Sequence, residues 1–122
     1  MKKLFLFVVL SVLASVNLSA GISEVEYKNN YYFVYDETGR ESSRKWIHEV
    51  GQLVGYNGSF MVFYKGKMFH TYDERFNKIA SQWEGQLGDF YNVSGTTIVF
   101  TKGSMVYMYD KRFKKVGERW NP

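Results

Sequence analysis

The feature that most limits how this chain can fold is a sequence repeat with a fixed period of 37 residues. The segment 72–76 reads YDERF and is followed by Trp83. The segment 35–37 reads YDE and is followed by Trp46, while 109–113 reads YDKRF and is followed by Trp120. The three copies align without a gap, which is typical of a repeat architecture.

The repeat divides most of the chain into two full units, 31–67 and 68–104, and a partial unit, 105–122. The two full units share the pairs Tyr35/Tyr72, Asp36/Asp73, Glu37/Glu74, Trp46/Trp83, Gly51/Gly88, Gly58/Gly95, Val62/Val99, Phe63/Phe100, Lys65/Lys102 and Gly66/Gly103. The segment 22–28 also falls into register, because its valine and lysine align with Val62 and Lys65.

Each unit has the pattern of short strands joined by tight turns. Lys65-Gly66 lies between two apolar runs, as a hairpin turn would. Asp36, Asp73 and Asp110 each end a run of aromatic and β-branched residues, where a carboxylate can accept backbone amides and start a turn. No segment holds an apolar period of 3.6 residues long enough for a helix. We therefore predict strands near 22–28, 31–36, 41–46, 51–56 and 59–65, with the later ones repeated.

The apolar runs 31–35 and 60–64 contain no alternation of polar and apolar residues, so we expect both of their faces to be covered. The segment 41–46 is mostly polar and suits an outer strand. This combination resembles a blade of a β-propeller, in which about four strands form a sheet that stacks on its neighbours. The resemblance implies an all-β antiparallel meander of about eleven strands.

The number of strands is too small for a closed propeller, which generally needs 4–8 blades. Some small bacterial and fungal lectins close their ring by association of short chains, and two copies of this chain would supply about six blades. The alternative is a monomer whose strands form a single β-barrel or sandwich.

The first twenty residues predict export. Lys2 and Lys3 precede an almost unbroken apolar run over 4–16, and small and polar residues end at Ala20. This order is typical of a signal peptide cleaved after Ala20, and the run is short for a membrane anchor. We expect a periplasmic or secreted protein, with no transmembrane span after cleavage, and a single all-β repeat domain over 21–122.

The composition of the exported part supports a packed domain without covalent staples. Removal of Lys2 and Lys3 leaves 14 basic and 12 acidic residues, a net charge of +2. The chain has no cysteine, but it has 10 Tyr, 10 Phe and 3 Trp. Aromatic packing must therefore stabilise the fold.

The strongest candidate binding residues are the three repeated tryptophans, because an indole can stack on the face of a sugar ring. The residue before each Trp differs between copies, so ligand contacts could differ as well. The candidate ligand-binding set is Trp46, Trp83, Trp120, Lys45, Gln82 and Arg119. The alternative role for each Trp is a packing anchor that recurs in every unit.

Nothing in the sequence predicts catalysis, a metal site or a cofactor. The repeated aspartates precede turns, which indicates a structural role. His48 and His70 are the only histidines and occupy different repeat positions, so no zinc spacing is present. The basic cluster at 111–119 is typical of a solvated hairpin tip, although it could meet an acidic glycan or lipid. Nucleic acid is not expected as a partner at this charge.

Two functions of different class remain open. The first is an exported non-catalytic binding module, lectin-like, whose ligand is a glycan. The second is a structural or assembly component of the cell envelope, which binds a protein partner through exposed edge strands. A hydrolase would need clustered carboxylates that the repeat does not predict.

Overall fold

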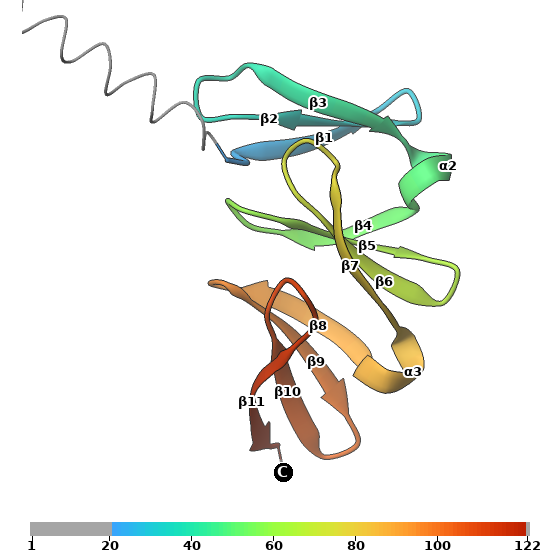
Figure 1. Cartoon of the computed structure of the whole chain (residues 1–122), viewed down its shortest axis with the longest axis vertical. Helices are drawn as coiled ribbons and strands as arrows, with labels where there is room; N and C mark the ends of the chain where they lie inside the picture. The colour runs from blue at the N-terminus through green and yellow to red at the C-terminus, as the bar shows by residue number, and fades with distance from the viewer. Residues whose placement is uncertain (1–20, 122) are drawn as a thin grey trace, which may run out of the picture.

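Residues 21–121, which the computed structural model describes, form eleven strands and two one-turn helices. The strands build three antiparallel sheets that follow one another along the long axis of the molecule (Figure 1). The predicted all-β meander is therefore confirmed. The predicted signal peptide, residues 1–20, lies outside the described residues.

Each sheet is a simple meander whose strands pair in chain order. The N-terminal sheet comprises β1 Glu24–Lys28, β2 Tyr31–Tyr35 and β3 Glu41–Trp46. The middle sheet comprises β4 Gln52–Tyr56, β5 Met61–Lys65, β6 Met68–Tyr72 and β7 Lys78–Trp83. The C-terminal sheet comprises β8 Asp89–Ser94, β9 Thr97–Lys102, β10 Met105–Tyr109 and β11 Lys115–Trp120. The polar segment 41–46 forms an outer strand, as predicted.

The sheets are separate, which excludes the alternative of one closed barrel. Two one-turn helices, α2 Ile47–Val50 and α3 Glu84–Leu87, connect consecutive sheets on the same side of the molecule (Figure 1). The sequence did not predict them, because four residues are too few for an apolar period to be recognised. No helix within residues 21–121 is long and apolar enough to cross a membrane.

Glycines end both helices at positions where no other residue fits easily. Gly51 and Gly88 have φ of +86° and +100°. A Cβ on Gly51 would collide with the carbonyl oxygen of Tyr64, and one on Gly88 with that of Thr101. The repeated glycine is thus explained by the close approach of the next strand.

The hairpin turn at Lys65-Gly66 and the turns that begin at the repeated aspartates are present, as predicted. The β5–β6 hairpin turns at Gly66 and Lys67, with φ of +65° and +63°, as a two-residue hairpin of right-handed twist requires. In the turn after β6, Asp73 Oδ1 accepts the backbone N–H groups of Arg75 at 2.8 Å and Asn77 at 2.9 Å. The same two acceptances recur at Asp36 and Asp110. These carboxylates are structural.

The core consists of two clusters, one on each side of the middle sheet. On β5, Met61 and Phe63 face the N-terminal sheet, whereas Val62 and the preceding Phe60 face the C-terminal sheet. All four side chains are at most 1% exposed. The prediction that the run 60–64 is covered on both faces is confirmed for these residues.

The same prediction is wrong for the run 31–35. Tyr32 and Val34 are buried against the middle sheet, but Tyr31, Phe33 and Tyr35 lie on the opposite, outward face. No other sheet of the described chain covers that face, since the N-terminal sheet is the first of the three. Continuous apolar character therefore did not require two covered faces here, because aromatic residues tolerate partial exposure.

The turns that begin at Asp73 and Asp110 join each sheet to the preceding one. Phe76 and Phe113 follow in these turns with φ of +60° and +61°, and both side chains are buried in the inter-sheet cores. Hydroxyls of the preceding sheet bind carbonyls of the turns: Ser43 Oγ donates to Glu74 O at 2.6 Å, and Thr71 Oγ1 donates to Lys111 O at 2.6 Å. The stacking of the sheets thus has both an apolar and a polar component.

Candidate functional site

The three repeated tryptophans lie on the surface rather than in the core. Trp46, Trp83 and Trp120 end the outer strands of their sheets and are 44%, 54% and 65% exposed. The buried phenylalanines Phe63 and Phe100 are fully covered in comparison. The exposure disfavours the packing-anchor interpretation and leaves each indole accessible to a ligand.

The backbone next to each tryptophan is held by the neighbouring hairpin turn. Ile47 N donates to Asn30 O at 2.9 Å, and Glu84 N donates to Lys67 O at 3.0 Å. The third copy of this bond joins Asn121 N and Ser104 O at 2.7 Å. Each indole is therefore presented at a defined place on the rim of its sheet.

The polar residues that precede the tryptophans do not share a face with them. Trp83 is paired with Met68, whereas Gln82 is paired with Phe69, whose side chain lies in the core on the other side of the middle sheet. Lys45 and Arg119 are likewise paired with the buried Tyr32 and Val106. Since side chains alternate along a strand, the predicted pairs Lys45–Trp46, Gln82–Trp83 and Arg119–Trp120 are not brought together.

The residues that share a face with Trp83 line a groove beside α2. This groove, termed the middle groove, has a volume of about 270 Å³, and its lining side chains are Glu49, Lys65, Met68, His70, Tyr72 and Lys78. Met68, His70 and Tyr72 alternate on β6 and so point to the same side. Trp83 lies directly across from Met68 in the strand register and extends this aromatic wall.

The same face of each sheet carries a cation next to an aromatic ring. The three contacts, measured to the ring centroid, are Arg44–Phe33 at 4.7 Å, Lys78–Tyr72 at 5.9 Å and Lys115–Tyr107 at 5.1 Å. The three cations do not occupy one repeat position, because Arg44 is equivalent to Ser81 whereas Lys115 is equivalent to Lys78. Each sheet nevertheless places a positive charge above an aromatic ring on this face.

The middle sheet differs from the two end sheets in how this cation is neutralised. The end sheets hold the ion pairs Arg44–Glu41 at 2.8 Å and Lys115–Glu118 at 2.6 Å. The equivalent residues of the middle sheet are Lys78 and Ser81, so Lys78 has no carboxylate partner within residues 21–121. Ser81 instead bonds His70.

His70 is held as a neutral ring. Its Nε2 lies 3.2 Å from Lys65 O, which can only accept, so Nε2 carries the proton; Nδ1 then accepts the Ser81 hydroxyl at 2.6 Å. Burial lowers the pKa of His70, and the positive charges of Lys78 and Lys65 lower it further. The imidazole therefore contributes an uncharged, oriented surface to the groove at neutral pH.

Of the two further polar groups that line the middle groove, Tyr72 and Lys65, only the Tyr72 hydroxyl is available to hydrogen-bond a ligand. Burial raises the pKa of Tyr72, and the nearby carboxylate of Glu49 raises it further, so the phenol keeps its proton. The ammonium of Lys65 is already occupied, because it donates to the carbonyls of His48 at 2.8 Å and Glu49 at 3.3 Å at the end of α2. The groove thus offers Lys78 as its cation and Glu49 as its carboxylate.

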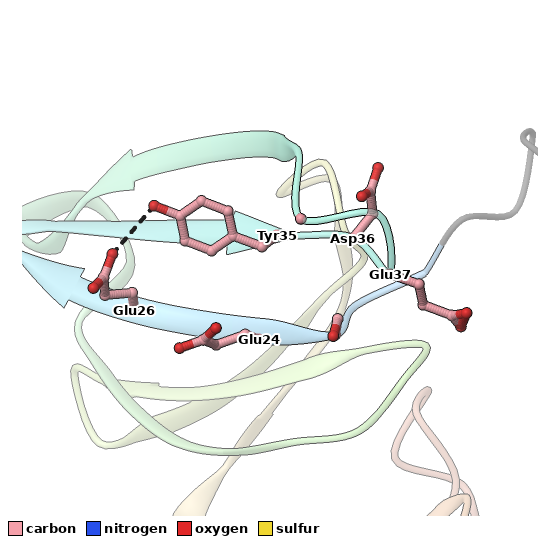
Figure 2. A pocket seen from close by; sticks show the side chains of 7 residues that line it. Glu24, Glu26, Tyr35, Asp36 and Glu37 are labelled. Carbon is pink, nitrogen blue, oxygen red and sulfur yellow. Dashed lines mark hydrogen bonds between the residues drawn. The ribbon is translucent and has the colours of Figure 1, made fainter.

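A second hollow lies on the outward face of the N-terminal sheet and is acidic (Figure 2). It has a volume of about 330 Å³, and its side chains are Ser23, Glu24, Glu26, Tyr35, Asp36 and Glu37. Two of its carboxylates already accept hydrogen bonds. Glu26 Oε1 accepts the Tyr35 hydroxyl at 3.1 Å, and Asp36 Oδ1 accepts backbone N–H groups of the turn that it begins. Among residues 21–121, no group of three or more His, Asp or Glu side chains is placed to hold a metal ion.

The ligand contacts predicted from the sequence do not include His70, Tyr72 or Lys78. The sequence did contain a sign of this site, in the charges of Lys78, Ser81 and the residues at the same repeat positions. The equivalent pairs in the three units are Glu41/Arg44, Lys78/Ser81 and Lys115/Glu118. Two are opposite charges, and the middle pair is the exception.

Comparison with known proteins adds no assignment. No family model matches the chain, and no curated protein matches it. The middle groove and the exposed tryptophans are the features of the molecule that indicate a function.

Proposed function

We propose that this protein is an exported, non-catalytic binding module for carbohydrate, and that the middle groove together with Trp83 is its binding surface. The observation that carries the proposal is the exposed Trp83 on the same face as the aromatic and polar side chains of β6. An indole with half of its surface in water leaves apolar area that a flat ligand can cover.

The chemistry of the middle groove supports a sugar better than an apolar ligand. Small-molecule sites combine aromatic walls with a few polar groups that fix orientation. Here Trp83 supplies aromatic surface, while Glu49, Lys78 and the Tyr72 hydroxyl can exchange hydrogen bonds with ring hydroxyls. Export through the predicted signal peptide would bring such a surface into contact with envelope or external glycans.

A binding measurement with a single indole tests the proposal. In the double variant Trp46→Phe and Trp120→Phe, Trp83 is the only tryptophan, so its fluorescence reports the middle groove directly. We expect a saccharide selected on a glycan array to change this fluorescence with a saturable dependence on concentration.

The matched pair of variants is Trp83→Ala and Trp120→Ala in the otherwise unchanged protein. Loss of an anchoring aromatic side chain typically costs about 2 kcal/mol of binding free energy, or roughly thirty-fold in affinity. We expect this loss for Trp83→Ala and less than about twofold for Trp120→Ala. Absence of any ligand on the array, or equal losses in both variants, would refute the proposal.

A second function, assembly with an envelope protein, is supported by a different observation. Strands β5 and β9 each have a hydrogen-bonded neighbour on both sides, but β1, the equivalent strand, has only β2 within the described residues. Its free edge could accept a strand from a partner. A photo-crosslinking residue at Glu24 or Lys28 should then give a discrete adduct with an envelope protein in cells; a crosslink pattern identical to that of a control position on β11 would contradict it.

A further inference from the structure

The middle groove contains a cation that lacks the carboxylate neighbour found beside the cation of each end sheet. Arg44 and Lys115 are each neutralised by a carboxylate three residues away, but the residue three positions after Lys78 is Ser81, which stands where the C-terminal sheet has Glu118. Ser81 in turn binds His70 and cannot supply a negative charge. Lys78 is exposed, and its ammonium lies above the ring of Tyr72.

The other charges of the groove leave Lys78 as the group that can meet an anion. The ammonium of Lys65 donates to the carbonyls that end α2, so it is directed toward the backbone. Glu49 belongs to α2, the opposite wall, and its carboxylate is close enough to Tyr72 to raise the pKa of the phenol. A bound molecule would therefore face a cation on the β7 side and an acceptor on the α2 side.

We propose that the saccharide bound by the middle groove is acidic, with a carboxylate on the ring that pairs with Lys78. The ring face lies against Trp83, and ring hydroxyls donate to Glu49. The negative charge of the ligand takes the place that Glu118 holds beside Lys115 in the C-terminal sheet. This inference rests on the proposed function, because it assigns a ligand class to the same groove.

The test compares two ligands with the same sugar rings, one with free carboxylates and one with neutral methyl esters. Trigalacturonate and its methyl ester have the same rings and hydroxyls, but only the first carries carboxylates. We expect the wild-type protein to bind the acid at least about tenfold more tightly than the ester at low salt. The preference should decrease as sodium chloride is raised from about 50 to about 500 mM, because salt screens exposed charges.

The matched variants are Ser81→Glu and Ser81→Gln. Both remove the hydroxyl that binds His70, and they differ only in whether a carboxylate is placed beside Lys78, as Glu118 is placed beside Lys115. We expect Ser81→Glu to bind the acid about tenfold more weakly than Ser81→Gln, with equal affinities of the two variants for the ester. Thermal unfolding of both variants verifies that they fold.

The outcomes separate this inference from the proposed function. Equal binding of acid and ester by the wild type, or equal binding of the acid by both variants, overturns the acidic-ligand inference and leaves carbohydrate binding standing. If neither acid nor ester binds while a neutral saccharide does, the inference also fails. If no saccharide of any kind binds, the proposed function itself fails.

Discussion

The covered and the outward faces of the three sheets are built on one repeat but carry different side chains. The middle sheet packs on the N-terminal sheet through Met61, Phe63 and Phe76. The outward face of the N-terminal sheet carries Glu24, Glu26 and Gly39 at the same repeat positions. The acidic hollow of Figure 2 therefore lies where a further sheet would pack, and carboxylates occupy the positions of the core residues.

The other end of the molecule shows a milder form of the same difference. The middle sheet meets the C-terminal sheet through Phe60 and Phe69, whereas the outward face of the C-terminal sheet has Thr97 and Val106 at these positions. Thr71, whose hydroxyl donates to Lys111 O in the turn of the C-terminal sheet, is replaced by Met108, which has no such donor. Both ends have thus lost the groups that join sheets.

The difference indicates that side chains on the outward faces disfavour the packing of further sheets of this repeat. Terminal units of repeat proteins carry polar outer faces, because no neighbour covers them. The strand count alone is compatible with closure of a ring of about six blades by two copies. The acidic outward face of the N-terminal sheet disfavours the packing of a further sheet there, and four experiments can break or sharpen this comparison.

The largest effect is expected when a residue of the outward face is placed in the core. Phe63→Glu introduces the carboxylate of Glu26 at a fully buried position. An unpaired buried charge costs more than about 4 kcal/mol, a large part of the stability of a small domain. We expect no cooperative thermal unfolding transition by circular dichroism. The reciprocal change Glu26→Phe should keep the protein folded, and a stable Phe63→Glu variant would contradict the role assigned to this face.

The next effect concerns the phenylalanine that each turn inserts into the preceding sheet. Phe76→Gly copies Gly39 into the middle sheet and empties a buried site. Removal of a core phenylalanine costs about 3–5 kcal/mol, and glycine recovers about 1 kcal/mol by relaxing the φ of +60°. We expect a net loss of about 2–4 kcal/mol in urea unfolding. The neighbouring change Arg75→Ala should cost less than about 0.5 kcal/mol, and similar losses for both would argue against the insertion.

A graft of the covered face onto the outward face should change association rather than folding. The triple variant combines Glu24→Met, Glu26→Phe and Gly39→Phe. It would expose an apolar face complementary to sheets of this repeat, and such a patch promotes self-association. Sedimentation at micromolar concentration should show a monomeric wild type and a self-associating variant. A wild-type dimer joined through this face would contradict its interpretation as a polar cap.

The smallest effect is a pH dependence at the outward face. The hydrogen bond from Thr38 lowers the pKa of Asp36 in the folded protein, with further lowering by the backbone amides of its turn. Because the folded pKa lies below the unfolded one, this group stabilises the fold above about pH 4, and the contribution disappears as pH falls through the lower folded pKa. The difference in urea midpoint between wild type and Asp36→Asn should shrink between pH 6 and pH 3. A constant difference would show that the charge of Asp36 does not stabilise this turn.

The sequence by itself determined the local structure of this protein. The strands, the hairpin turn at Gly66, the aspartate turns and the outer position of 41–46 were all predicted, because each depends on residues close to one another in the chain. The repeat made these predictions stronger, since every turn was seen more than once. The two one-turn helices were missed, as four residues leave no periodic signal.

The tertiary structure alone decided which surfaces meet. Whether the strands form one barrel or three sheets depends on contacts between distant residues, and the sequence left both open. The predicted pairs of Trp83 with Gln82 and of Trp46 with Lys45 failed to form one site because neighbours in a strand point to opposite faces. The middle groove, in contrast, gathers Glu49, His70 and Lys78 from three elements that only the packing of the sheets brings together.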